Sequence, residues 1–465
     1  MSLLRGRPPL PITSRKEFVM HISLSEHFSY RKLLRFTFPS IIMVTFTSVY
    51  GVVDGLFVSN FVGKTPFAAI NLIWPFLMIL GCGGFMIGTG GSALVSKTMG
   101  EGDGERANRY FSLLVLFTVA LGVAITIPGF FLIEPVALLL GADEAMIPYC
   151  VLYGRILLIG QTSFMLQGVF QSFLVTAERP TFGLAVTVGA GCTNMLLDFL
   201  FIAVLEWGLV GAALATVSSQ VVGCVIPLVY FILPNKSPLR IRRPRLGILQ
   251  GICTIGKVAI NGSSELMTNI SMSVVNMLYN HRLMTLAGED GIAAYGVMMY
   301  VSFFFVSAFI GYSIGSAPVV GFHYGAGNHS ELKSLLRKSL ILTSLAGVGM
   351  AGLSVVLATP LSTIFVGYDE GLFELTRRGF LLYSTSFLFA GFGIFGSSFF
   401  TALGNGGVSA AMSFLRTLLF QVAAVMILPI FFQTDGIWLS ITAAELLATG
   451  ITAAFLLGMR KKYKY

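Results

Sequence analysis

Apolar runs of about 20 residues recur along the whole chain and are separated by short polar stretches. A helix of that length spans the ~30 Å hydrocarbon core of a bilayer. Only 11% of the residues are charged, whereas about a quarter are charged in a typical soluble domain. The chain therefore lacks the charge needed to cover a water-exposed surface. We predict an all-α integral membrane protein that crosses the bilayer many times.

The apolar runs predict twelve transmembrane spans, an even number that places both termini on one side of the membrane. Cytoplasmic loops are enriched in Lys and Arg. With both termini cytoplasmic, 23 of the 30 basic residues fall in cytoplasmic segments and only four in the opposite loops. This distribution accounts for the net charge of +9 without a nucleic-acid partner. The predicted spans are 33–58, 68–95, 110–133, 147–174, 181–204, 208–233, 251–280, 291–322, 336–358, 374–402, 407–431 and 436–459.

The two halves of the chain resemble each other when the sequence is aligned with itself at a constant offset of 225 residues. At that offset Gly90 meets Gly315, and Gly100 meets Gly325. Each half holds six spans, so the two halves have the same orientation and form a parallel repeat about an axis along the membrane normal. Such a pair of lobes suits transport by alternating access. The predicted organisation is a cytoplasmic tail (1–30), an N-lobe (31–233), a cytoplasmic linker (234–250), a C-lobe (251–459) and a short tail (460–465).

Two aspartates lie inside apolar spans, Asp54 in YGVVDGLFVSN and Asp198 in GCTNMLLDFLF. Charges at such depth are costly and usually functional, although Asp54 could also be a structural residue bonded to a neighbouring helix. Asn194 precedes Asp198 by four residues and shares its helix face. Counted from the span ends, Tyr153 and Thr216 reach a similar depth in the outer half of the N-lobe. We therefore predict one pocket containing all five residues.

The predicted pocket offers oxygen ligands, which suit a proton or a hard cation such as Na⁺ better than a softer metal. Two neighbouring carboxylates share a proton or need a cation between them. The Na⁺ ligands would be Asp54, Asn194, Asp198 and Thr216. The residue types leave H⁺ and Na⁺ open. They indicate no other cofactor.

Several motifs resemble the multidrug and toxic compound extrusion (MATE) family, in its DinF-like branch. They are VDGLFVSN in the first span, GTGGSALVSKTMGEGD after the second and NxxxD in the fifth. The resemblance covers nearly the whole chain from about residue 30. It implies that Asp54, Tyr153, Asn194, Asp198 and Thr216 form a cation site. It also implies that Pro39 bends the first span in response to protonation. The alternative is a plain kink, because a proline bends any helix.

The C-lobe lacks this set, because the repeat positions that correspond to Asp54, Asn194 and Asp198 are Tyr279, Leu419 and Ala423. Glu265 stands near an acidic position that the NorM-like branch uses. We expect it to attract cationic drugs or to pair with Lys257 or Arg416. Arg155 is expected to pair with Asp143, Glu144 or Asp198. Candidate residues of the substrate cavity, for which simple packing is the alternative, are Glu265, Gln161, Met165, Met272, Asn276 and Met298.

We predict a cation-coupled (H⁺ or Na⁺) multidrug antiporter of the inner, cytoplasmic membrane. Its partners are drug-like small molecules and the lipid bilayer, and we expect a monomer that is not an enzyme. A lipid-linked precursor flippase is the alternative, although such proteins often have fourteen spans and a basic cavity. An intramembrane enzyme is a more distant alternative, because Mg²⁺-dependent prenyl transfer needs Asp-rich loops such as DDxxD, which are absent from the sequence.

Overall fold

The computed structural model describes residues 22–243 and 247–465. The basic segment 5–15, which the sequence predicts to be disordered, lies outside these residues. Helices make up nearly all of the described chain, and no strand occurs in it. The predicted all-α membrane fold is therefore confirmed.

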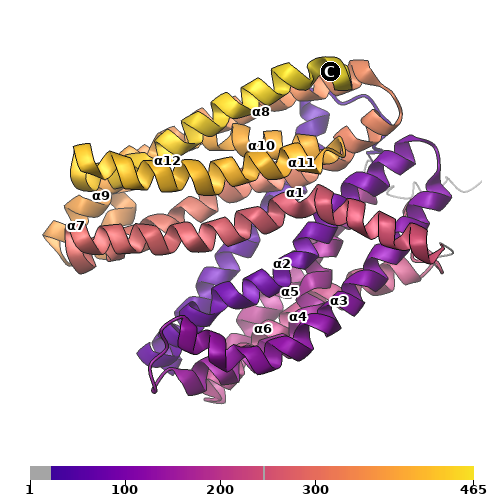
Figure 1. Cartoon of the computed structure of the whole chain (residues 1–465). Coiled ribbons are helices and arrows are strands. Elements are labelled where there is room, and N and C mark those ends of the chain that lie inside the picture. The colour runs from indigo at the N-terminus through magenta and orange to yellow at the C-terminus, as the bar shows by residue number, and fades with distance from the viewer. Residues whose placement is uncertain (1–21, 244–246) are drawn as a thin grey trace, which may run out of the picture.

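Six helical crossings form the N-terminal half of the chain (Figure 1). Two of them, the first and the fifth, end in short π-helical turns (η1 and η2). The elements are α1 (Tyr30–Phe57), η1 (Val58–Val62), α2 (Lys64–Gly100), α3 (Gly104–Leu139), α4 (Ile147–Thr176), α5 (Pro180–Asp198), η2 (Phe199–Val204) and α6 (Gly208–Ile232).

The C-terminal half has the same number of crossings but is divided differently. Its elements are α7 (Ile248–Gly325), α8 (His329–Val366), α9 (Glu370–Ser384), α10 (Phe387–Ala402), α11 (Gly406–Phe414), η3 (Leu415–Leu419) and α12 (Phe420–Tyr463).

Within the described ranges, nine helices are long and apolar enough to cross a membrane, and a bent pair makes a tenth. Two of the nine are broken by non-helical backbone, at Gly288 in α7 and at Gln433 in α12. At 78 and 58 residues, each of these two is long enough for two crossings, because one crossing needs about 20 residues. Dividing them at the breaks gives the predicted twelve. The tenth span, predicted as one helix over 374–402, is α9 followed by α10 with a 51° bend.

The helices form two bundles, one of α1–α6 and one of α7–α12, which diverge toward one end in Figure 1. They meet closely at the end that carries the C-terminus. There a Cβ on Gly100 would lie 2.0 Å from the carbonyl oxygen of Phe322, and one on Gly325 would lie 2.0 Å from that of Lys97. The offset of the sequence repeat carries Gly100 onto Gly325 and Lys97 onto Phe322, so the two contacts are equivalents in the repeat.

A second pair of contacts repeats the same relation. Gly90 of α2 packs against Gly262 in the first part of α7, and Gly315 in the second part of α7 packs against Thr37 of α1. The repeat offset converts one contact into the other, because it carries Gly90 onto Gly315 and Thr37 onto Gly262. The interface between the lobes is therefore pseudo-symmetric, and glycine lets the backbones touch there.

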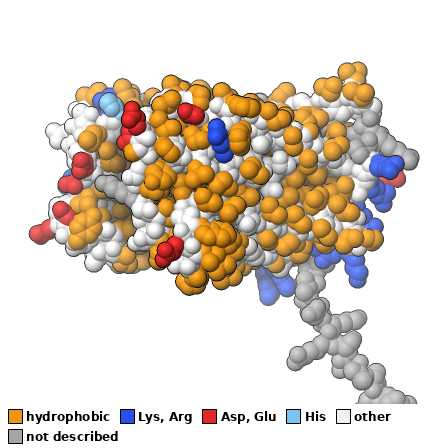
Figure 2. All heavy atoms as spheres, turned by 90° about the horizontal axis from the view of Figure 1, so that it is seen from below, with side chains coloured by type: hydrophobic (Ala, Val, Ile, Leu, Met, Phe, Trp, Pro, Cys, Tyr) orange, Lys and Arg blue, Asp and Glu red, His pale blue; other side chains and the backbone are white. Residues whose placement is uncertain are grey.

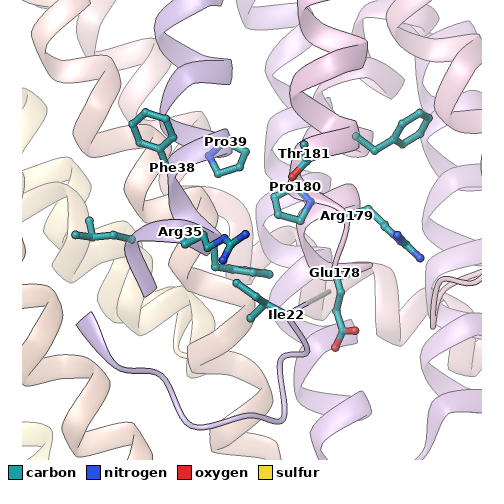
Figure 3. A pocket seen from close by; sticks show the side chains of 11 residues that line it. Ile22, Arg35, Phe38, Pro39, Glu178, Arg179, Pro180 and Thr181 are labelled. Atoms are coloured by element: carbon teal, nitrogen blue, oxygen red, sulfur yellow. The ribbon is translucent and has the colours of Figure 1, made fainter. Parts of the chain in front are cut away.

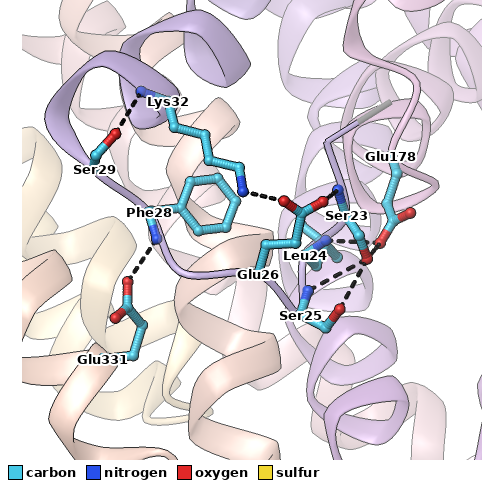
Figure 4. A network of polar contacts seen from close by, with 9 residues as sticks. All are labelled: Ser23, Leu24, Ser25, Glu26, Phe28, Ser29, Lys32, Glu178 and Glu331. Atoms are coloured by element: carbon cyan, nitrogen blue, oxygen red, sulfur yellow. Dashed lines mark hydrogen bonds and ion pairs between the residues drawn. The ribbon is translucent and has the colours of Figure 1, made fainter. Parts of the chain in front are cut away.

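A short segment before α1, residues 22–29, joins the two lobes at their closed end; we call it the N-terminal strap (Figure 4). On the N-lobe side, the Ser23 hydroxyl and the Leu24 N–H donate to Glu178 Oε1 at 2.8 and 2.7 Å. On the C-lobe side, the Phe28 N–H donates to Glu331 Oε1 at 2.9 Å. The strap thus spans the interface with a buried hydrogen bond to the C-lobe.

Charged side chains gather at the two ends of the molecule, and hydrophobic side chains cover the region between them (Figure 2). Lys and Arg crowd the end near the closed interface, whereas Asp and Glu dominate the other end. Such a pattern is typical of a membrane protein whose basic end faces the cytoplasm.

Candidate functional site

Both predicted acids lie where a regular helix gives way to a π-helical turn. Asp54 stands four residues before η1, and Asp198 is the last residue of α5, directly before η2. Turns of this kind are rare in helices and occur often at functional sites. Both acids lie in the part of the N-lobe remote from the closed interface.

The side chains of the predicted pocket come together from four helices. Asp54 of α1 and Asp198 of α5 interact electrostatically with each other. Tyr153 of α4 interacts with both acids and with Thr216 of α6. Asn194 lies one turn before Asp198 on α5 and is buried, with 1% of its surface exposed.

This pocket leaves several buried polar atoms without a hydrogen bond. Asp198 has no exposed surface, and neither of its carboxylate oxygens makes a hydrogen bond to a described residue. The same holds for one oxygen of Asp54, both side-chain polar atoms of Asn194 and the hydroxyl of Thr216. A buried charge without a partner is strongly unfavourable. The pocket therefore needs a proton or a cation between its two acids.

The donor set of the pocket is made of carboxylate, amide, hydroxyl and phenol oxygens. These groups suit a proton or Na⁺. Within residues 22–243 and 247–465, no three His, Cys, Asp or Glu side chains gather as they would around a resident transition metal. The geometry is thus compatible with a coupling ion that enters and leaves.

Tyr50 belongs to the same region and was missed in the sequence. It precedes Asp54 by one helical turn, interacts with it electrostatically, and packs against Gly191 of α5. The spacing of four residues before Asp54 was the available signal.

The C-lobe has polar groups at the corresponding level, but they satisfy one another. Tyr279, the counterpart of Asp54, donates to Gln421 Oε1 at 3.1 Å and stacks on Tyr295. Glu445, a buried acid of this lobe, accepts from Arg416 Nε at 2.8 and 3.1 Å. The N-lobe differs at this level, because its facing acids Asp54 and Asp198 have no cationic partner among the described residues.

Glu265 does not form either of its predicted ion pairs. Arg416 is engaged by Glu445, and Lys257 makes no ion pair with Glu265 in the described part of the chain. Glu265 lies instead beside Thr89 and Cys82 of α2. It therefore faces the opposite lobe, across the interface.

The other candidate cavity residues divide into two groups. Met165 packs against Gly84, and Met298 against Gly379, and neither side chain has exposed surface. Gln161 is also buried, near the carbonyl oxygen of Leu77. Asn276 accepts from the Tyr295 hydroxyl at 2.9 Å, and Met272 is 38% exposed.

The prediction for Arg155 is wrong, and that for Pro39 stays open. Arg155 makes no ion pair in the described chain; its guanidinium lies over the Phe130 ring, 4.8 Å from the centroid. A cation–π contact there replaces the expected acid partner. Pro39 is buried within α1 and lines a cavity beside the strap (Figure 3).

Comparisons with known proteins agree on one family. A family model described as MatE matches residues 39–200 and again residues 266–427, once in each lobe. The chain is 23% identical over 420 residues to the multidrug export protein MepA of Staphylococcus saprophyticus, and the aligned region covers 88% of each chain. It is 22% identical over 437 residues to MepA of Staphylococcus haemolyticus, covering 93% of this chain and 94% of that one.

Solved structures show the same fold. One, described as the outward-facing conformation of a multidrug resistance MATE family transporter, has a TM-score of 0.89 and 22% identity. Another, a MOP superfamily transporter from Pyrococcus furiosus, has a TM-score of 0.88 and 22% identity. Each covers 95% of this chain and 98% of its own.

Proposed function

The chain belongs to the MatE family, and on that premise we propose that it exports organic compounds by antiport against H⁺ or Na⁺. The observation that carries the coupling proposal is the pair of acids, half-buried Asp54 and buried Asp198, that has no cationic partner among the described residues. A protein that held these acids for stability alone would be expected to neutralise them, as Arg416 neutralises Glu445 in the C-lobe. Multidrug export is proposed from the two MepA relatives.

The arrangement of the lobes supports a starting point for the cycle. They touch at the basic end, which we propose to be cytoplasmic, and diverge at the other. On that orientation the structure corresponds to an outward-facing state. A cation entering from outside would then reach Asp54 and Asp198, which lie in the outer half of the N-lobe.

The proposed cycle follows from charge. Binding of the cation removes the repulsion between Asp54 and Asp198 and changes the packing of α1 against α5. Because α1 also contacts α7 across the interface, this change lowers the affinity for the exported compound. The compound leaves, the lobes rock about the interface, and the cation is released to the cytoplasm.

Efflux of a fluorescent cationic dye from cells tests the role of the acids. Asp54→Asn and Asp198→Asn keep the size of each side chain and remove its charge. We expect both variants to lose dye efflux while reaching the membrane in normal amounts. Asp290→Asn, at an exposed acid beyond the break in α7, is the control and should export like the parent. Normal efflux by both pocket variants would exclude the proposed coupling site.

The identity of the coupling ion needs its own measurement. Efflux is compared with and without Na⁺ at one fixed pH, and then at several pH values without Na⁺. Dependence on Na⁺ at fixed pH assigns the pocket to Na⁺, and efflux that follows the proton gradient alone assigns it to H⁺.

We also propose a monomer in the cytoplasmic membrane with both termini inside. A reporter that is active only in the cytoplasm, fused after Tyr465, should be active. An inactive reporter on a functional transporter would reverse the topology.

A further inference from the structure

A cavity of about 600 Å³ lies between the first turns of α1 and α5, beside the N-terminal strap (Figure 3). The proposed transport cycle does not use it. Leu34 and Phe38 of α1, Phe182 of α5 and Ile22 of the strap form its apolar wall. Leu34 and Phe38 are 40% and 59% exposed, so this wall is open to the outside of the bundle.

Two arginines line the cavity, and in Figure 3 the side chain of one, Arg179, points away from α1. Arg35 is exposed and makes no ion pair or hydrogen bond within the described chain. Arg179 has a buried Nε atom that makes no hydrogen bond to a described residue. The acid at the cavity, Glu178, is bonded to the strap through Ser23 and Leu24. The cavity therefore combines apolar walls with cationic groups.

The start of α5 adds to the positive character. Arg179 occupies the N-cap position and supplies no side-chain acceptor for the first turn. The N–H groups of Thr181 and Phe182 belong to that turn, and both residues line the cavity. A helix N-terminus carries partial positive charge, so a cation at its cap is unfavourable unless an anion is close. In Figure 3, Arg35 and Thr181 lie on opposite sides of the space between the two helices.

We propose that this cavity binds an anionic phospholipid of the surrounding membrane, such as phosphatidylglycerol. The phosphate group lies between Arg35 and the first turn of α5, at the level where both helices leave the bilayer. An acyl chain follows Leu34 and Phe38 toward the hydrocarbon. A soluble anion would leave the exposed apolar wall uncovered, whereas a lipid matches both the apolar wall and the cationic groups of the cavity.

The location gives the lipid a specific mechanical role. Pro39 and Ile22 line the same cavity, so the lipid contacts the proline of α1 and the end of the strap together. These elements must move relative to α5 when the closed end opens. A bound lipid therefore stabilises the conformation in which the lobes meet at this end.

Thermal melting of the full-length protein in neutral detergent tests the proposal without measuring transport. The protein is titrated with phosphatidylglycerol, with phosphatidylcholine and with free glycerol phosphate. We expect phosphatidylglycerol alone to raise the melting temperature in a saturable manner. Because one charge-assisted contact contributes roughly 1.5 kcal/mol or more, Arg35→Gln should weaken the apparent affinity about tenfold.

Matched variants separate a site from general charge attraction. Arg337→Gln removes an exposed cation from α8 at the same end of the molecule and should leave the titration unchanged. Arg179→Gln, at a side chain that points away from α1 (Figure 3), should weaken binding less than Arg35→Gln does. If either variant folds poorly, Arg35→Lys keeps the charge and should give an intermediate affinity.

Three results would each overturn the proposal. They are equal stabilisation by phosphatidylcholine, stabilisation by glycerol phosphate at the same concentration, and unchanged phosphatidylglycerol affinity in folded Arg35→Gln. Because transport is not measured, failure of the lipid site leaves the proposed antiport unaffected. Loss of antiport likewise leaves the lipid titration unaffected.

Discussion

Glu331 holds the N-terminal strap against the C-lobe, and its replacement should loosen the closed end. Its Oε1 atom accepts the buried Phe28 N–H, and its Oε2 atom lies 2.6 Å from His27 Nδ1. Glu331→Ala removes the acceptor for the Phe28 N–H. Leaving a buried donor unsatisfied costs about 1–3 kcal/mol, so we expect Glu331→Ala to lower the stability by about 2 kcal/mol.

The contribution of His27 should be much smaller. Its side chain is 71% exposed, and exposed ion pairs contribute about 0–1 kcal/mol. His27→Ala should therefore change the stability little. Glu331→Gln keeps an oxygen for the Phe28 N–H and should likewise cost less than about 1 kcal/mol. The three variants thus separate the backbone hydrogen bond from the ion pair.

The assay is thermal melting of the purified variants in one detergent and lipid mixture. The predicted order of melting temperatures places Glu331→Ala well below the parent, with Glu331→Gln and His27→Ala close to it. If Glu331→Gln falls as far as Glu331→Ala, the charge rather than the hydrogen bond fixes the strap. If Glu331→Ala melts like the parent, the reasoning is refuted.

Two further perturbations test the interface and the C-lobe. A Cβ on Gly262 would lie 2.0 Å from the Met86 carbonyl oxygen, whereas one on Gly256 meets nothing within 4 Å. Gly262→Ala should therefore reduce dye efflux, and Gly256→Ala should not. Equal efflux by the two variants would exclude a close contact between the lobes at Gly262. Arg416→Gln leaves Glu445 buried and unpaired, which costs roughly 3–5 kcal/mol. The melting temperature should therefore fall sharply, and the double variant Arg416→Met with Glu445→Leu should recover it. A parental melting temperature in Arg416→Gln would show that the pair is dispensable.

The number of spans could be predicted because bilayer thickness fixes the length of an apolar helix. The bend between α9 and α10 could not, because Thr385 and Ser386 at the bend include neither Pro nor Gly. The breaks at Gly288 and Gln433 fall between predicted spans, where the sequence already indicated a turn. Glycines at equivalent positions of the two halves make equivalent contacts, but the repeat alone did not indicate which helices would meet.

The residues of the candidate pocket could be predicted because depth in the membrane follows from the direction of each span. Partners far apart in the sequence could not be deduced in this way. Arg416 and Glu445 lie on different helices, and no local spacing connects them. The strap was missed because residues 22–29 are too polar to suggest buried contacts, although Leu24 and Phe28 are fully buried.

The central claim is that the acids of the N-lobe exchange a cation for the exported compound. The direct measurement uses proteoliposomes loaded with a dye substrate, in which dye efflux and cation entry are recorded together after a cation gradient is imposed. The parent should couple the two fluxes, and Asp198→Asn should pass neither in response to the gradient. Coupled fluxes of parental size in Asp198→Asn and in Asp54→Asn would contradict the account.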